Sequence, residues 1–341
     1  MIPTRHLLAG LGLPDTDAHD LPASAKRFDD GGQWRLEIPS TEGPESLRTV
    51  LAAADEHGLR VHRVSQGSGI TLQSDDEIRE MVALGAERDL EVSLFTGPRA
   101  GWDVGVQAVT SSGRIAGMSL RGADQLRYGL DDVVRACELG LRSVLISDLG
   151  LLRVLGRLRA AGHLPSDLVL KVSVSLPASN PATAALLEEL GATTINLPVD
   201  LTLAQLAAIR AAVDVPVDLY VETTDDFGGL LRYHEIPEIV RVAAPVYLKF
   251  AVRNSPGLYP SGEHLREAAL STARERVRRA ALGIALLERT APAAVMSRSS
   301  GHGLPATMPA APAGTAASAG PDASAVGARD SSSASANGGA A

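Results

Sequence analysis

The stretch LKVSVSLPASNPATAALLEELGATTINLPVDLTLAQLAAIRAAVDVPVDLYVE, residues 170–222, shows how this chain folds. Three short apolar segments are separated by two longer segments whose apolar residues recur with helical spacing. Pro181 opens the first of these longer segments and Gly191 follows it, and both residues are favoured at those ends of a helix. The stretch therefore predicts a strand–helix–strand–helix–strand unit with parallel strands.

The same alternation of strand and helix runs from about residue 33 to residue 290. Five further strands are expected in WRLEIP (34–39), LRVHRVS (59–65), LEVSLF (90–95), SVLISD (143–148) and VYLKFAV (246–252). Eight strand–helix units in about 260 residues predict an α/β fold, a closed (β/α)8 TIM barrel. A doubly wound open sheet is the alternative, but the sequence has no GxGxxG or P-loop motif to favour it.

Composition excludes several classes of protein. The 341 residues carry a net charge of −8 and contain no basic run, so we expect no nucleic-acid partner. Cys137 is the only cysteine, which excludes a disulfide within the chain and a four-cysteine Fe–S or zinc site. No segment has the roughly 18 apolar residues that span a membrane, and the N-terminus does not resemble a signal peptide. We therefore expect a cytoplasmic protein without membrane contact.

One barrel domain with three additions is expected. Residues 1–30 are polar and turn-rich and predict an N-terminal arm, and the barrel occupies residues 31–290. Residues 96–125 are too long for an ordinary strand–helix loop, which indicates an insertion after the third strand. Residues 291–341 consist mainly of Ala, Gly, Ser and Pro, and this composition predicts a disordered low-complexity tail.

Polar residues occupy alternate positions of several predicted strands. The apolar positions of a barrel strand pack against the outer helices, so the polar positions point into the barrel. This places Lys171 and Lys249 inside, where each ammonium group needs a partner such as Glu37, Asp218 or Glu222. Either an internal ion-pair network or a functional site at the C-terminal strand ends accounts for this set. The other side chains expected on this face are those of Arg35, His62, Ser173, Thr194, Asn196, Tyr220 and Tyr247.

The segment LRSVLISDLGLLRVL, residues 141–155, and the run 170–222 resemble the central part of peptidase family U32, the collagenase-like (β/α)8 proteins. YHEIPEIVRVAAPVYLKFAVRN, residues 233–254, is similar to the closing segment of that family, in which a helix precedes a strand bearing Lys-x-Glu-Gly-Arg. The resemblance spans about residues 35–280. It implies a TIM barrel with peptidase or other hydrolase activity.

The resemblance also implies site residues. Asp148 stands at the Ser-Asp position of the family, and Asn180 stands at the Asn that follows the fifth strand. Lys249 and Arg253 stand at the Lys and Arg of the closing motif. Glu222 departs from the family, whose seventh strand ends in His-Gly. The cysteines that hold an Fe–S cluster in some branches are absent, so we expect no cluster.

An anion pocket is expected at the C-terminal mouth of the barrel. Lys249 and Arg253 occupy the same face of one strand, and such a pair can hold a carboxylate or phosphate. The Gly/Ser-rich segment SQGSGI, residues 65–70, can add backbone N–H donors. The expected protein is a hydrolase that acts on a small or peptide-like anionic substrate. Its substrate-binding candidates are Lys249, Arg253, Asn180, Asn196, Gln66 and Arg121, and its catalytic candidates are Glu222, Asp148, Lys171 and Glu37.

Three alternatives stay open. A lyase or aldolase would form a Schiff base through Lys171 or Lys249. A metal-assisted enzyme would hold Mg²⁺ or Mn²⁺ with Glu37, Asp148 and Glu222, because hard oxygen ligands suit these ions, and no other cofactor is predicted. A non-catalytic binding protein or a subunit of a larger complex would expose a large apolar patch. Such a complex could also be a homo-oligomer of this chain.

Overall fold

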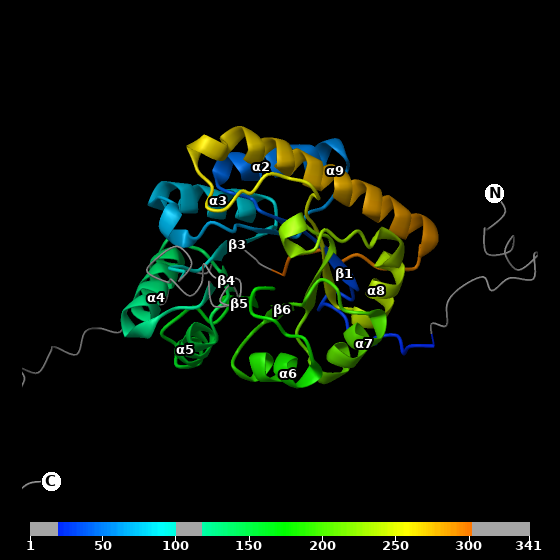
Figure 1. Cartoon of the computed structure of the whole chain (residues 1–341), viewed down its shortest axis with the longest axis horizontal. Coiled ribbons are helices and arrows are strands. Elements are labelled where there is room, and N and C mark those ends of the chain that lie inside the picture. The colour runs from blue at the N-terminus through cyan, green and yellow to red at the C-terminus, as the bar shows by residue number, and fades with distance from the viewer. Residues whose placement is uncertain (1–19, 100–117, 302–341) are drawn as a thin grey trace, which may run out of the picture. The chain divides into compact units, whose positions relative to one another are not determined.

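Residues 20–99 and 118–301, which the computed structural model describes, form a closed barrel of eight parallel strands (Figure 1). Each strand pairs with its neighbours in chain order, and β8 returns to pair with β1, so that Glu37 lies beside Lys249. The predicted TIM barrel is confirmed. The strands are β1 (Trp34–Pro39), β2 (Arg63–Ser65), β3 (Glu91–Phe95), β4 (Ser143–Ile146), β5 (Val169–Val172), β6 (Thr194–Asn196), β7 (Val217–Glu222) and β8 (Val246–Phe250).

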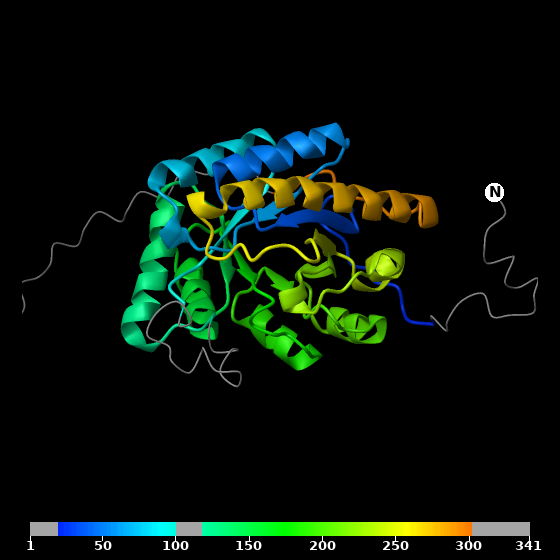
Figure 2. The same ribbon diagram turned by 45° about the horizontal axis from the view of Figure 1, so that its top comes forward.

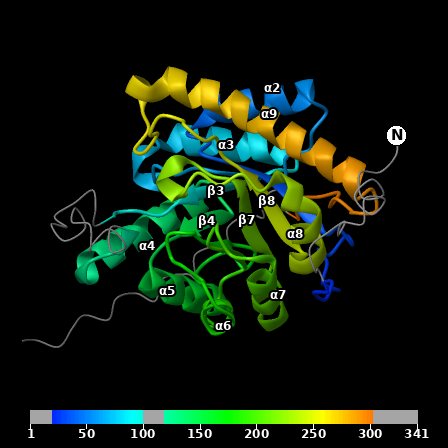
Figure 3. The same ribbon diagram turned by 45° about the vertical axis from the view of Figure 1, so that its right-hand side comes forward.

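Helices surround this sheet and cover its outer face (Figures 1 and 2). Apolar strand residues pack against them, mainly through Leu, Val, Ile and Ala side chains. The helix α9 lies along α2 at the seam where β8 meets β1 (Figure 3). None of the described helices is long and apolar enough to cross a bilayer. The helices are α2 (Pro44–Glu56), α3 (Asp75–Glu87), α4 (Gly122–Glu138), α5 (Leu149–Ala160), α6 (Pro181–Glu189), α7 (Leu203–Ala212), α8 (Ile236–Ala243) and α9 (Arg266–Thr290).

Helix boundaries follow signals that the sequence contains. Ser74 begins α3 with a capping box, in which its hydroxyl accepts the Glu77 N–H and the Glu77 carboxylate accepts the Ser74 N–H. Thr202 and Gln205 form the same arrangement at α7. Each such cap contributes about 1 kcal/mol to helix stability. The positions of these helices were predictable because their end signals are local.

The N-terminal end of the barrel is closed by segments from both ends of the described chain. Phe28 of the arm packs edge-on against Tyr247, with ring centroids 5.4 Å apart, and the Arg35 guanidinium lies 3.9 Å from the Phe28 ring. Arg35 Nε donates to Ser297 Oγ at 2.9 Å, and its Nη1 donates to the Ser300 carbonyl oxygen at 2.7 Å. Residues close to the C-terminal limit of the described chain therefore form part of the barrel floor.

Residues 291–301, which we predicted to be the first part of the disordered tail, are instead packed under the barrel. Ser297 and Ser300 are buried, and Met296 forms a bridge to Trp34 of β1. Their small polar side chains bury little apolar area, and they are held by hydrogen bonds to the barrel, which composition does not reveal. Residues 1–19, 100–117 and 302–341 lie outside the described residues, and with them lies most of the predicted insertion.

We expect a chain that ends at residue 290 to melt about 5–10 °C below a chain that ends at residue 301. Loss of residues 291–301 leaves the buried Arg35 without two hydrogen-bond acceptors, and removing the partners of a buried charge costs about 2–3 kcal/mol. Calorimetry of the two truncated proteins measures the difference. Equal melting temperatures would contradict this role of the segment.

His62 is buried next to the same floor. Its Nδ1 accepts a hydrogen bond from the Leu36 N–H at 3.1 Å, and its Nε2 donates to the Ser297 carbonyl oxygen at 2.9 Å. Only the neutral ring can make both bonds, since protonation would set an Nδ1–H against the Leu36 N–H. Burial lowers the pKa of His62 to about 4.

His62 should make the protein less stable as the pH falls from 6.5 toward 4. In this window the unfolded chain binds a proton at His62 and the folded chain does not, so stability rises with pH across it. The full effect is on the order of 3 kcal/mol. Urea denaturation across this window should give a flatter pH dependence for His62→Gln than for the natural chain. His57→Gln, at an exposed site, is the control and should leave the slope unchanged.

Candidate functional site

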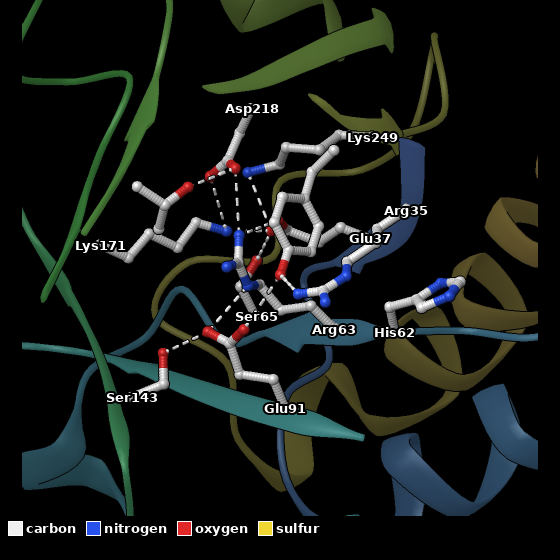
Figure 4. A network of polar contacts seen from close by, with 12 residues as sticks. Arg35, Glu37, His62, Arg63, Ser65, Glu91, Ser143, Lys171, Asp218 and Lys249 are labelled. Carbon is white, nitrogen blue, oxygen red and sulfur yellow. Dashed lines mark hydrogen bonds and ion pairs between the residues drawn. The ribbon is translucent and has the colours of Figure 1, made fainter. Parts of the chain in front are cut away.

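Glu37 lies at the centre of a network of charged side chains inside the barrel (Figure 4). It is fully buried on β1, and its Oε1 contacts the Lys171 ammonium group and lies 3.0 Å from Lys249 Nζ. The same oxygen accepts a hydrogen bond from Ser65 Oγ at 2.7 Å, and Oε2 lies 3.3 Å from Arg63 Nη1. Side chains from β1, β2, β5 and β8 thus meet at one carboxylate.

Arg63 connects Glu37 with two further carboxylates. Its Nη1 lies 3.1 Å from Asp218 Oδ1, and its Nε lies 2.8 Å from Glu91 Oε1. The guanidinium also lies 3.5 Å from the centroid of the Tyr247 ring. Every one of these charged groups is buried, and each has an opposite charge beside it, as burial requires.

Glu37 and Lys171, at the centre of the network, are ionised at neutral pH. Burial raises the pKa of Glu37, but the attraction of Lys171, Lys249 and Arg63 outweighs burial and holds this pKa well below its usual range. Burial lowers the pKa of Lys171 to about 8 against the attraction of Asp218 and Glu37, so its ammonium form still predominates at pH 7. Glu37 is therefore a fixed anion, which counts against the predicted catalytic role as a proton acceptor.

A pocket opens above this network at the C-terminal mouth of the barrel. It has a volume of about 720 Å³, part of it open to solvent. Lys249 lies in its floor, where its Nζ contacts Glu37 and lies 4.4 Å from the centroid of the Tyr220 ring. Asn196 and Ser173, at the C-terminal ends of neighbouring strands, line the same pocket. Further lining comes from Ser65, Gln66, Phe95, Arg99, Phe227 and Tyr259.

Three of the predicted substrate-binding residues meet in this pocket: Lys249, Asn196 and Gln66. The Gln66 amide is occupied by its own loop, because Oε1 accepts the Gly69 N–H at 3.0 Å and Nε2 donates to the Gly69 carbonyl oxygen at 3.2 Å. Gln66 therefore shapes the loop after β2, and Lys249 and Asn196 remain as groups that can contact a ligand.

The Gly/Ser-rich loop after β2 does not offer its N–H groups to a ligand. Glu42 accepts them instead, the Gly67 N–H at 2.7 Å through Oε1 and the Ser68 N–H at 3.1 Å through Oε2. Burial raises the pKa of Glu42 against these hydrogen bonds. The N–H donors that this segment could add to an anion pocket are therefore taken by an internal carboxylate.

Glu222 points away from the barrel interior, so its predicted inward position is wrong. The pairing of β7 with β8 is regular as far as Tyr220, and a register shift follows between Tyr220 and Glu222. The Tyr233 hydroxyl donates to Glu222 Oε2, and Arg279 Nη1 of α9 lies 3.5 Å from Oε1. Glu222 thus connects β7 to the outer helices and does not line the mouth pocket.

Asp148 and Asn180 begin helices. Asp148 Oδ1 accepts the Leu151 N–H at 2.8 Å at the start of α5, and Asn180 Oδ1 accepts the Thr183 N–H at 2.9 Å at the start of α6. Asp148 Oδ2 also accepts the Leu120 N–H at 3.0 Å. Neither residue lines the mouth pocket, so the structure favours capping over the predicted catalytic and substrate-binding roles.

Arg253 and Arg121 lie outside the pocket lining. The half-exposed Arg253 pairs with Asp225 at 3.0 Å, and Asp225 also accepts the Asn254 N–H, so Asp225 clamps the loop after β7 to the loop after β8. Arg121 precedes the first residue of α4. Arg253 therefore does not converge with Lys249 on one anion, as the sequence predicts.

The three carboxylates considered as metal ligands do not meet. Glu37 lies inside the barrel, Asp148 caps a helix, and Glu222 lies among the outer helices. Across residues 20–99 and 118–301, no three His, Cys, Asp or Glu side chains are arranged to hold a metal ion. The alternative of Mg²⁺ or Mn²⁺ bound by these three residues is therefore wrong.

Sequence reasoning does not find Arg63 and Glu91. The strand β2 begins only at Arg63, later than the apolar segment suggests, so Arg63 and Ser65 face the interior in place of His62. His62 reaches the barrel floor instead. For Glu91, the available signal is its alternation with Ser93 in an otherwise apolar strand.

Similarity to a known protein family is found from the fourth helix–strand unit of the barrel to the end of β7. The model of peptidase family U32 matches residues 122–224, from the start of α4 to just beyond β7. Over these residues the chain is similar to peptidase family U32. The U32 segment contributes Lys171, Asn196 and Asp218 to the site, whereas Glu37 and Lys249 lie outside it.

Similar solved structures include that of the U32 peptidase Mk0906, with 17% identity and a TM-score of 0.40 over 68% of this chain and 97% of that chain. A structure described as native KDPGal shows 11% identity and a TM-score of 0.41 over 75% of this chain and 98% of that chain. No curated protein matches the chain.

Glu37→Gln should lower the free energy of unfolding by about 3–5 kcal/mol. The change removes the charge that Lys171, Lys249 and Arg63 share, and it leaves buried cations without compensation. Glu45→Gln, which breaks an exposed ion pair with Arg266, is the control and should cost less than about 1 kcal/mol. Urea denaturation of both variants measures the two losses of unfolding free energy. Equal losses would show that the buried ion pairs of Glu37 contribute no more to stability than an exposed ion pair.

Proposed function

We propose that this chain is a hydrolase that binds a small or peptide-like anionic substrate at the C-terminal mouth of its barrel. The position of Lys249 in the floor of the mouth pocket carries the proposal. Its Nζ lies 3.0 Å from Glu37 Oε1, but that oxygen also contacts the Lys171 ammonium group. One carboxylate oxygen is thus shared by two cations, and a negative group of the substrate supplies Lys249 with a second partner.

Burial strengthens this attraction. In surroundings of low dielectric constant, an incompletely compensated ammonium group attracts an anion more strongly than it does at the surface. Arg99, whose guanidinium lies 3.7 Å from the centroid of the Phe95 ring, adds positive charge to the pocket wall. A cation in the floor and a cation in the wall suit a carboxylate or a phosphate.

Hydrolysis as the reaction class is supported by the family description of residues 122–224. The predicted acid–base residues Glu222 and Asp148 are engaged outside the pocket, and no carboxylate is found among the described residues that line it. Lys249 therefore binds the substrate, and neither of these two carboxylates takes part in proton transfer.

The two other candidate functions have less support. Of the two lysines considered for a Schiff base, Lys249 lines the pocket and Lys171 does not, but Lys249 Nζ is engaged by Glu37 Oε1 at 3.0 Å, whereas a Schiff base requires an amine that is free to attack a carbonyl group. A partner subunit would expose a large apolar patch. The exposed large apolar side chains of the described chain are spread over separate elements, for example Leu149 on α5 and Leu186 on α6.

Small anions should raise the melting temperature of the full-length chain, and Lys249→Gln should abolish this shift. At a ligand concentration of 100 times Kd, binding stabilises the folded state by about 2.7 kcal/mol. The probes are acetate, inorganic phosphate and N-acetylglycine, measured by thermal shift. Lys26→Gln is the control, because Lys26 pairs with Asp214 away from the pocket and should leave the ligand shift intact.

Two outcomes would contradict the proposal. If none of the anions stabilises the chain, the mouth pocket is not an anion site. If borohydride in the presence of pyruvate attaches the ligand covalently to Lys249, a lyase of the Schiff-base class replaces the hydrolase.

A further inference from the structure

Asn196 carries a buried polar atom without a partner. The strand β6 places its side chain in the wall of the mouth pocket, together with Ser173 and Tyr220. The residue is only 1% exposed, and within the described chain its Oδ1 accepts no hydrogen bond. The preceding inward residue of the strand, Thr194, is by contrast paired with Asp218 at 2.7 Å. An unpaired buried acceptor lowers stability, so its position in the pocket indicates a partner that arrives with the ligand.

Aromatic side chains are concentrated in the same pocket. The whole chain contains four Phe and five Tyr residues, and four of them line the pocket: Phe95, Tyr220, Phe227 and Tyr259. They come from separate segments of the chain, whereas the barrel core consists mainly of aliphatic side chains. Aromatic walls in a ligand pocket favour a flat group of the ligand, which can stack on them.

We propose that the substrate is a small planar carboxylate that carries an N–H or O–H donor, and that Asn196 determines this specificity by accepting a hydrogen bond from the donor. This inference rests on the proposed function, because Lys249 binds the carboxylate. The aromatic side chains contact the planar group, and Asn196 distinguishes ligands with a donor from ligands without one. Aromatic N-acyl amino acids and heteroaromatic acids with a ring N–H share this chemistry.

The experiment compares ligands that differ only in the donor. Hippurate has an amide N–H where 4-oxo-4-phenylbutanoate has a methylene group. Indole-2-carboxylate has a ring N–H where benzofuran-2-carboxylate has an ether oxygen. Calorimetric titration of the full-length chain should show a roughly tenfold preference for the N–H member of at least one pair, as expected for one hydrogen bond to a buried acceptor. A preference within the first pair indicates that the substrate is an N-acyl amino acid. A preference within the second pair indicates a heteroaromatic acid with a ring N–H.

Asn196→Leu removes the acceptor and keeps the size of the side chain. The preference for the N–H ligand should fall to about one, while the melting temperature should stay the same or rise because an unpaired polar group has been removed. Ser93→Ala is the matched control. Ser93 Oγ is also buried without a hydrogen bond in the described chain, but Ser93 does not line the pocket, so this variant should keep the preference. A lower melting temperature of Asn196→Leu with an unchanged preference would show a structural role and overturn the inference.

The results distinguish failure of this inference from failure of the proposed function. Equal affinities within both pairs, with binding still lost in Lys249→Gln, would overturn the role of Asn196 and leave anion binding standing. Binding of phosphate without binding of any of the four carboxylates would overturn this inference as a whole and leave anion binding at the pocket standing. Absence of binding by every anion would overturn both.

Discussion

The ionised carboxylate of Glu37 is the interaction on which the barrel interior depends. Lys171, Lys249 and Arg63 arrive from three other strands and surround it, and all four side chains are withdrawn from water. Removing charges from water is so costly that such a group is tolerated only when its partners are in place. The charges of the barrel interior therefore depend on one another, because removal of one charged side chain leaves its partners buried without compensation.

The two ends of this arrangement differ. Toward the floor, Arg63 reaches Glu91 and the Tyr247 ring, and residues 291–301 close the barrel with hydrogen bonds to Arg35 and His62. Toward the mouth, Lys249 shares its carboxylate and faces a pocket. The same network that stabilises the barrel thus leaves a cation at the end where (β/α)8 proteins bind their ligands.

Strand alternation made the fold and much of the inner face predictable. Lys171, Lys249 and Asp218 were placed correctly, because successive side chains of a strand point to opposite sides. The same rule failed for His62 and Glu222, since β2 begins later than its apolar segment and β7 has a register shift before its last residue. An offset of one residue reverses the direction of every side chain that follows.

The sequence by itself determined the eight strand–helix units, their order and the polar inner face, because hydrophobic periodicity and helix caps are properties of neighbouring residues. Only the tertiary structure decided which charges meet. Glu37 and Lys171 are separated by 134 positions, and their contact depends on the stagger of strands around the barrel. The tertiary structure also decided that Asp148 and Asn180 cap helices and that Asn196 faces the pocket without a hydrogen-bond partner in the described chain. Each of these roles depends on the groups that surround the side chain in space.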